Sequence, residues 1–196
     1  MKAFFVFLFI AVSGLVQAQE GENFSPDTSR VYHSIEAALQ NPDHVYKLNL
    51  SRKKLRAVPP EIVQFRNLKE LNLSKNKIRE LPPQIVELQN LERLNLSSNK
   101  LKALPEDIGK LQSLIYLGLN RNLIESLPQS IGSLPYLEIL ELWDNELDSI
   151  PKEISRLTKL RVLELRGILF NDEEQTRVKS LLPNTKIYFS PGCNCK

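Results

Sequence analysis

The sequence predicts an α/β solenoid in which short parallel strands alternate with short helical segments. The first observation is a period, because the same residue types recur every 23 residues in segments that begin at Val45, Leu68, Leu91, Leu114, Leu137 and Leu160. The second is composition, because leucine supplies 34 of the 196 residues and occupies most of the recurring apolar positions. One unit cannot bury its own apolar face, so the units must stack and merge their leucines into one core.

The first residues have the pattern of a secretory signal peptide. A positive start at Met1-Lys2 precedes an apolar run that ends at Val16, and Val16-Gln17-Ala18 offers small residues at the positions that a signal peptidase reads. The run is shorter than a membrane-spanning helix requires. We therefore expect a signal peptide over residues 1–18, export to the periplasm or the exterior, and no membrane span.

Residues 19–44 are expected to form an N-terminal cap that covers the first leucines. Ser34 is a good N-cap residue for a short helix over residues 35–40, and Asn41-Pro42 ends it.

Each repeat combines a strand pattern with a helical pattern. In the unit that begins at Leu68, Leu71 and Leu73 flank one polar residue, as in a strand with one buried face. The stretch from Pro82 to Leu88 has helical spacing and a proline at a helix-start position. Between the two segments an asparagine recurs at Asn76, Asn99, Asn122 and Asn145. A buried amide there can bond backbone groups that the turn out of the strand leaves unpaired.

On these residues the chain resembles the leucine-rich repeat family in its 23-residue form, L-x-x-L-x-L-x-x-N-x-[LI]-x-x-[LIV]-P-x-x-I-x-x-L. The resemblance covers residues 45–170 as five full units and one partial unit. It implies a curved parallel sheet on a concave face and short helical segments on the convex face. The layout looks like that of secreted bacterial members, because the caps lack the cysteines typical of extracellular animal members.

Residues 171–190 are expected to form a C-terminal cap, followed by a tail over residues 191–196. Asp172 is predicted as the N-cap of a helix with Gln175 at the capping-box position, and residues 186–189 as a last strand.

The composition argues against catalysis, metal binding and cofactors. The chain has two histidines and two cysteines, and the cysteines are close together in the tail. Two ligands cannot complete a tetrahedral metal site. No nucleophile, base and orienting group can be assembled, and no glycine-rich loop could hold a phosphate. No aromatic residues on which bases could stack lie among the lysines of the first units, and an exported protein rarely meets nucleic acid, so the chain is not expected to bind it.

The resemblance implies that strand residues between the leucines point to the concave side, where family members most often bind proteins. The first column down the stack is Lys47, Glu70, Arg93, Tyr116, Ile139 and Val162. The second is Asn49, Asn72, Asn95, Gly118, Glu141 and Glu164, and the third is Ser51, Ser74, Ser97, Asn120, Trp143 and Arg166. Large apolar residues rimmed by charge gather in the later units, which is typical of an interface hot spot.

The sequence therefore predicts a non-enzymatic module that binds an unidentified protein partner on the concave face. The predicted partner-binding residues are Trp143, Tyr116, Ile139, Val162, Glu141, Glu164, Arg166, Asn120 and Arg93.

The alternative is a site for a glycan or another polyanion on the basic ridge of the first units. The ridge consists of Arg52, Lys54, Lys75, Lys77 and Lys100. Such a ridge could hold an anionic glycan or steer an acidic partner. It could equally be a solvated turn face that needs no ligand.

Overall fold

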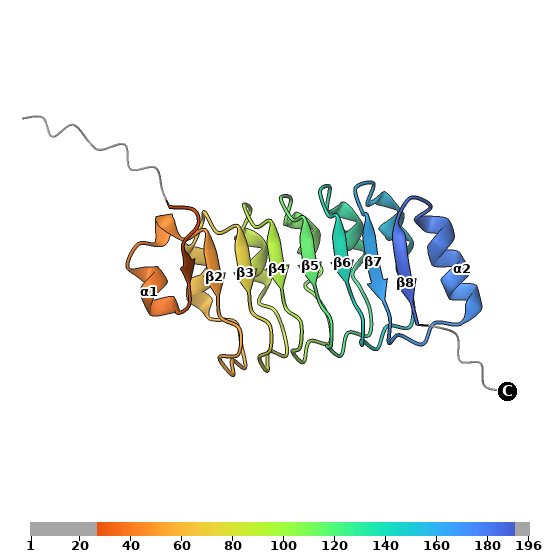
Figure 1. Cartoon of the computed structure of the whole chain (residues 1–196), viewed down its shortest axis with the longest axis horizontal. Helices are drawn as coiled ribbons and strands as arrows, with labels where there is room; N and C mark the ends of the chain where they lie inside the picture. Colours follow the sequence, from red (N-terminus) through yellow and green to blue (C-terminus); the bar gives the residue numbers. More distant parts are fainter. Residues whose placement is uncertain (1–26, 191–196) are drawn as a thin grey trace, which may run out of the picture.

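The computed structural model describes residues 27–190, so the expected signal peptide and the tail lie outside the described residues. Eight strands form one parallel sheet in chain order (Figure 1). They are β1 (Val31–Tyr32), β2 (Lys47–Asn49), β3 (Glu70–Asn72), β4 (Arg93–Asn95), β5 (Tyr116–Gly118), β6 (Ile139–Glu141), β7 (Val162–Leu165) and β8 (Lys186–Phe189). The predicted α/β repeat solenoid is confirmed.

Neighbouring repeat strands pair in a register of 23 residues, so that Lys47 lies beside Glu70, and Glu70 beside Arg93. The pairing places residues at the same offset of each unit in straight columns, as the period predicted. One column after the strands has a left-handed backbone, with φ between 53° and 59° at Arg52, Lys75, Ser98, Arg121 and Asp144. Gly167 continues this column at φ 77°.

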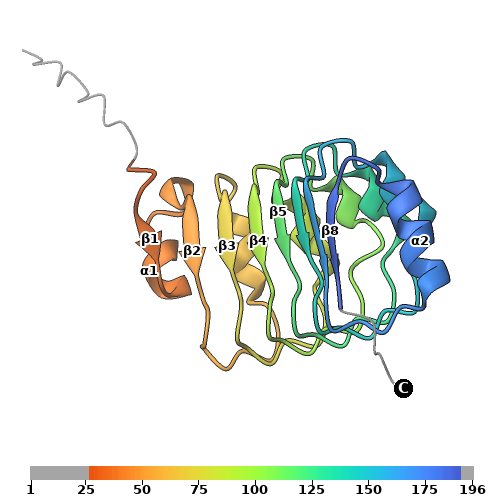
Figure 2. The ribbon, with the colours of Figure 1, turned by 45° about the vertical axis from the view of Figure 1, so that its right-hand side comes forward.

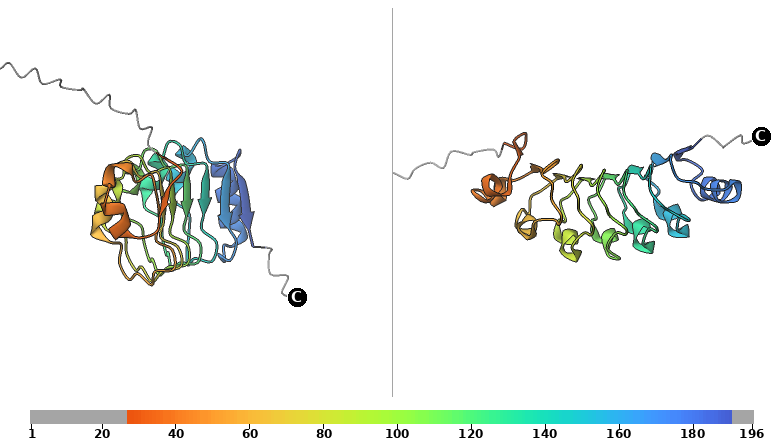
Figure 3. Two further views of the ribbon diagram at one scale, coloured as in Figure 1. Left: turned by 60° about the vertical axis from the view of Figure 1, so that its left-hand side comes forward. Right: turned by 90° about the horizontal axis from the view of Figure 1, so that it is seen from below.

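The return segments are 3-10 helices, which suits their shortness. They are η1 (Pro42–His44), η2 (Pro60–Gln64), η3 (Pro83–Glu87), η4 (Ile108–Lys110), η5 (Gln129–Ser133) and η6 (Lys152–Arg156). Seen from below, the sheet lines the inner side of an arc and these turns line its outer side (Figure 3). The two faces are therefore a concave sheet and a convex row of turns.

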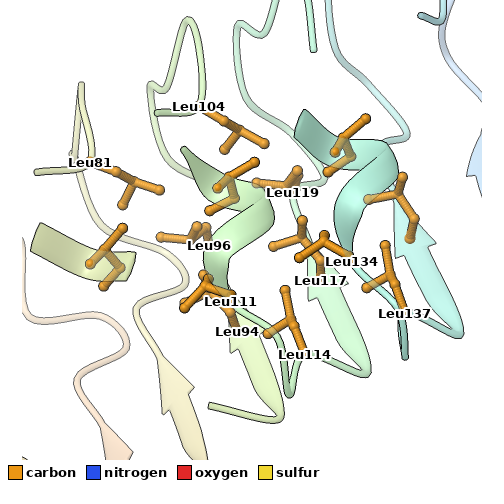
Figure 4. Close-up of a cluster of buried hydrophobic side chains, with 14 of the residues drawn as sticks. Leu81, Leu94, Leu96, Leu104, Leu111, Leu114, Leu117, Leu119, Leu134 and Leu137 are labelled. Atoms are coloured by element: carbon orange, nitrogen blue, oxygen red, sulfur yellow. The ribbon is translucent and has the colours of Figure 1, made fainter. Parts of the chain in front are cut away.

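The leucines of all units form one hydrophobic core between the sheet and the turns. Leu94, Leu96, Leu117 and Leu119 are completely buried and lie against the leucines of adjacent units (Figure 4). The core extends from Tyr32 in the first strand to Leu182 in the C-terminal cap.

The recurring asparagines are buried and join each unit to its neighbour. The Asn122 side chain accepts a hydrogen bond from the Leu101 N–H (3.1 Å) and donates to the carbonyl oxygens of Leu96 (3.1 Å) and Leu119 (2.8 Å). The same pattern is present at Asn76, Asn99 and Asn145. Their predicted structural role is confirmed.

The convex side is packed differently in its two halves. Val63 in η2 and Val86 in η3 are partly buried against the core, whereas the equivalent positions in η4 and η5 are Gly109 and Gly132. A methyl group at Gly109 would overlap the Ser130 carbonyl oxygen, and one at Gly132 would overlap that of Glu153. The glycines therefore allow η4, η5 and η6 to pack closely, while the valines hold the first turns further apart.

The N-terminal cap contains the predicted helix and a strand that the sequence did not predict. Helix α1 (Ile35–Leu39) begins where the Ser34 hydroxyl accepts a hydrogen bond from the Ala37 N–H (3.2 Å). It ends one residue earlier than expected, with Gln40 as the C-cap. Strand β1 has only two residues, too few for a periodic signal, and pairs with β2 at the edge of the sheet.

Helix α2 (Asp172–Leu181) covers the other end of the core (Figure 2). The predicted last strand is present as β8, and it pairs with β7. The predicted N-cap was wrong by one residue, because the side chain that accepts from the Glu174 N–H (2.8 Å) belongs to Asn171. Asp172 is instead the first helical residue. The expected capping box is also replaced, since Gln175 donates to the Phe170 carbonyl oxygen (3.1 Å).

An ion pair in α2 is expected to make this cap sensitive to acid. Glu174 accepts hydrogen bonds from Arg177 Nε (2.6 Å) and from the Ile150 N–H of the preceding repeat (2.8 Å). The bond with Arg177, more than that with Ile150, lowers the pKa of Glu174 below its ordinary value of 4.5. The ionised Glu174 side chain therefore stabilises the fold at pH values above its unfolded-state pKa. This stabilisation is lost as the pH falls through its folded-state pKa.

We expect Glu174→Gln to lower the free energy of unfolding by about 1–2 kcal/mol at neutral pH. The difference from the wild type should shrink as the pH falls from 4.5 and disappear below the lowered folded-state pKa of Glu174, where the wild-type carboxylate also becomes protonated. Urea denaturation at neutral pH and at an acidic pH below that folded-state pKa measures this. Glu173→Gln, an exposed position in the same turn, is the control and should have little effect. A loss that is equal at both pH values would contradict the role of the charge.

Candidate functional site

The three predicted concave columns lie side by side along the sheet, because the strand register repeats without a shift from β2 to β7. The site is built from the C-terminal half of these columns. Tyr116 and Ile139 are paired residues of β5 and β6, and Ile139 pairs in turn with Val162 of β7.

A continuous hydrogen-bonded chain connects four of the predicted residues. Tyr116 Oη donates to Glu141 Oε2 (2.9 Å), and Asn120 Nδ2 donates to the same oxygen (2.7 Å). The Asn120 Oδ1 then accepts from the Trp143 N–H (3.1 Å). The strand residues Tyr116 and Glu141 are therefore fixed relative to the turn residues Asn120 and Trp143.

Arginines from the preceding units cover both aromatic rings. The guanidinium carbon of Arg93 lies 4.5 Å from the centre of the Tyr116 ring, and that of Arg121 lies 4.4 Å from the Trp143 ring. Arg121 also forms an ion pair with Asp144 (3.5 Å). Tyr116 and Trp143 are half-buried as a result, while Arg93 and Arg121 remain exposed. The surface is a mixed aromatic and charged one rather than a bare apolar patch.

The phenol of Tyr116 is held in its protonated form. Burial raises the pKa of Tyr116 well above its ordinary value, and the hydrogen bond to Glu141 raises it further. The group therefore acts as a hydrogen-bond donor throughout the physiological pH range.

Gly118 makes this arrangement possible. A methyl group on Gly118 would lie 2.5 Å from the Tyr116 Oη and 3.0 Å from its Cζ, so the Tyr116 ring can lie along the strand only over a glycine. Sequence reasoning did not identify this role. The available signal was that Gly118 is the one glycine in a column that starts with three asparagines.

We expect Gly118→Ala to displace the Tyr116 ring and break its hydrogen bond to Glu141. The pKa of Tyr116 should then fall back toward its ordinary value of 10.0, because both burial and the hydrogen bond are lost. Spectrophotometric titration of the tyrosines measures this, with Tyr116→Phe to identify the perturbed group. The fold should be retained, because the displaced side chain can turn toward solvent. An unchanged titration curve in the alanine variant would contradict the proposed contact.

Two other predicted residues form a separate pair beside this chain. Arg166 binds Glu164 through both its Nε and a terminal nitrogen, each at 2.7 Å, and Glu164 is buried. The Arg166 guanidinium lies 5.7 Å from the ring of Tyr188 in β8, and Lys186 Nζ lies 5.0 Å from it. Tyr188 and Lys186 were missed because the predicted columns stopped at the last repeat.

A hollow occupies the other, N-terminal half of the concave face. Val31 and Tyr116 lie at its two ends, and its lining includes Lys47, Glu70, Arg93, Asn49, Asn72 and Asn95. Tyr116 and Arg93 therefore belong to both halves of the concave face. Sequence reasoning placed the site beyond this hollow, because it searched for large apolar residues.

Comparison with known proteins agrees with this architecture. A family profile described as a leucine-rich repeat region matches residues 34–115 and 106–181, which is most of the chain. The chain belongs to the leucine-rich repeat family. Leucine-rich repeat proteins are in general non-enzymatic modules for protein–protein interaction.

Two solved leucine-rich repeat structures are similar to this one. A leucine-rich repeat protein of Leptospira interrogans has 33% sequence identity and a TM-score of 0.64, over 83% of this chain and 49% of that one. The ectodomain of the Arabidopsis thaliana membrane receptor kinase GASSHO1/SCHENGEN3, solved in complex with CASPARIAN STRIP INTEGRITY FACTOR 2, has 25% identity and a TM-score of 0.58. That match covers 76% of this chain and 21% of the ectodomain. The chain thus spans about half the length of the first structure and a fifth of the second. No curated protein sequence matches the chain significantly.

The basic ridge of this leucine-rich repeat protein lies where the strands turn away from the concave face. Its five side chains, Arg52, Lys54, Lys75, Lys77 and Lys100, are exposed, and within residues 27–190 none of them forms an ion pair. Further along the chain the basic residues Lys102 and Arg121 are paired with acidic ones. In the described part of the chain the ridge is therefore a run of positive charge without acidic partners.

The described part of the chain contains no group of three or more His, Cys, Asp or Glu side chains placed to hold a metal ion. Among residues 27–190, no helix has the length and apolarity needed to cross a membrane.

Proposed function

We propose that this protein is a non-enzymatic recognition module that binds a protein partner on its concave face. Tyr116 and Trp143 form the centre of the contact, with Glu141, Asn120 and Arg93 around them. The single observation that carries the proposal is the hydrogen-bonded chain from Tyr116 through Glu141 and Asn120 to Trp143.

Fixed aromatic side chains suit recognition. Tyrosine, tryptophan and arginine are the residue types enriched in interface hot spots. Holding a side chain in one conformation before binding reduces the entropy lost on association. The Tyr116 side chain is held by its hydrogen bond to Glu141 and by the stacked Arg93. The Trp143 backbone is fixed by Asn120 and its ring is covered by Arg121, and both aromatic residues keep part of their surface exposed. The complex seen for the Arabidopsis ectodomain supports a partner-binding role for a related fold.

The test is a binding experiment with the whole chain and two matched variants. The first variant combines Tyr116→Ala with Trp143→Ala. The second is Tyr136→Ala, which removes an aromatic residue that is 59% exposed and lies in the loop before β6, outside the concave columns. A protein captured at high salt by the wild type and by the Tyr136 variant, but not by the double variant, is the expected result.

Two outcomes would overturn the proposal. Binding that survives the double variant would move the site away from the aromatic half of the face. If that binding is also lost at high salt, charge dominates it, and the basic ridge becomes the site. Circular dichroism of both variants checks that the repeats remain folded.

A further inference from the structure

We propose that the N-terminal hollow of the concave face is a second site, which binds a linear oligosaccharide of hexopyranose units. The site consists of the amide row Asn49, Asn72 and Asn95, together with Lys47, Glu70 and Arg93. It is separate from the aromatic half proposed above to bind a protein: Arg93 belongs to both sites, and Tyr116, from the centre of the protein contact, borders the end of the hollow.

The three amides face the hollow with their donor groups free. Each Oδ1 accepts a hydrogen bond at 3.0 Å from the backbone N–H two residues later, at Ser51, Ser74 and Ser97. Since only the oxygen can accept that bond, each Nδ2 must point the other way. Within residues 27–190 these NH₂ groups have no hydrogen-bond partner, and they reach solvent, because no buried side-chain nitrogen is left unbonded there.

The spacing of this donor row distinguishes between polymers. Adjacent strands lie about 4.8 Å apart, and so do successive amides along the row. Carbonyl groups on one side of an extended peptide repeat every second residue, at about 6.7 Å. This repeat does not match the spacing of the amides, so successive carbonyl groups cannot all reach successive amides. A pyranose ring is about as long as the gap between neighbouring strands. Successive sugar units can therefore each present a hydroxyl or ring oxygen to successive amides.

The charges of the hollow also fit a polyhydroxylated ligand better than an acidic peptide. Lys47 and Glu70 form an ion pair (2.9 Å), which offers a donor and an acceptor side by side. Because Lys47 is already paired with Glu70, Arg93 is the one remaining cation among the lining residues that could attract a run of carboxylates. Hydroxyl groups both donate and accept hydrogen bonds, so they can use the amides and the ion pair together.

The test is NMR titration of the side-chain amide resonances of the full chain with cellotetraose and with chitotetraose. Asn49, Asn72 and Asn95 should shift on adding at least one of the two sugars, while the buried amides of Asn76 and Asn99 should not. Asn72→Asp keeps an acceptor for the Ser74 N–H but removes the donor, and should weaken binding on the order of tenfold. Asn184→Asp makes the same change at an exposed position outside the hollow and should not alter binding.

Three results would overturn the assignment. They are the absence of any shift in the three amides up to the solubility limit of both sugars, shifts caused by poly-glutamate instead, and sugar binding that is unchanged in the Asn72 variant. The experiment is independent of the proposed protein interaction. Trp143→Ala should abolish capture of the protein partner and leave the sugar titration intact, whereas Asn72→Asp should weaken sugar binding and leave capture of the protein partner intact.

Discussion

Replacing Asn122 with alanine is expected to lower the free energy of unfolding by about 3–5 kcal/mol, because three buried backbone groups lose their partner together. The side chain accepts from the Leu101 N–H and donates to the carbonyl oxygens of Leu96 and Leu119. These three groups belong to two adjacent units, and water cannot replace the amide without entering the core. Urea denaturation followed by circular dichroism measures the loss.

Asn72→Ala is the matched control for this prediction. Asn72 lies on the concave face, and its side chain accepts one hydrogen bond, from the Ser74 N–H (3.0 Å). Because that side chain borders solvent, its loss should cost only about 0.5–1.5 kcal/mol. If the two alanine variants are equally stable, the buried asparagines do not join the units as described.

The second large effect is expected for Gly132→Ala on the convex side. The added methyl group would overlap the carbonyl oxygen of Glu153 in η6, and a backbone atom cannot turn aside as a side chain can. The turns η5 and η6 must therefore separate. Forcing an extra methyl group into a packed region costs about 1–3 kcal/mol, so the midpoint of urea denaturation should fall.

The control is Ser155→Ala, at the equivalent position of the next unit. Ser155 is exposed, and its hydroxyl donates to the Lys152 carbonyl oxygen within its own turn (2.9 Å). A change within about 0.5 kcal/mol is expected there. If Gly132→Ala changes the free energy of unfolding as little as Ser155→Ala does, the close packing of η5 and η6 has no role in stability.

Features that depend on the period were predictable from the sequence. The strand columns, the core leucines and the buried asparagines all follow from the 23-residue offset, because the same offset sets both the sequence pattern and the strand register. The 3-10 turns are consistent with the predicted helical return, since the spacing of Pro82, Ile85 and Leu88 suits any short helix.

Features that depend on contacts across the columns were not predictable. Lys75 and Arg121 have a positive φ, although lysine and arginine are not residue types that favour a left-handed backbone. In the sequence, this conformation is indicated by Gly167, which stands at the same offset of its unit. The position of the Tyr116 ring over Gly118 depends on side-chain conformation rather than on spacing. The N-cap at Asn171 was misplaced by one residue, because Asn171 and Asp172 are both good N-cap residues and sequence alone does not choose between them.

The unbroken register also determines how a chain of this kind can change in length. Each internal unit contacts its neighbours along the stack, the N-terminal cap contacts the first unit, and the C-terminal cap contacts the last two units. Loss of residues 68–90 would bring Lys47 beside Arg93 in the same register, and duplication of that unit would extend the sheet by one strand. Recombination between repeats could therefore lengthen or shorten the concave face in steps of one strand without disturbing either cap. Its span can evolve separately from the residues that line it.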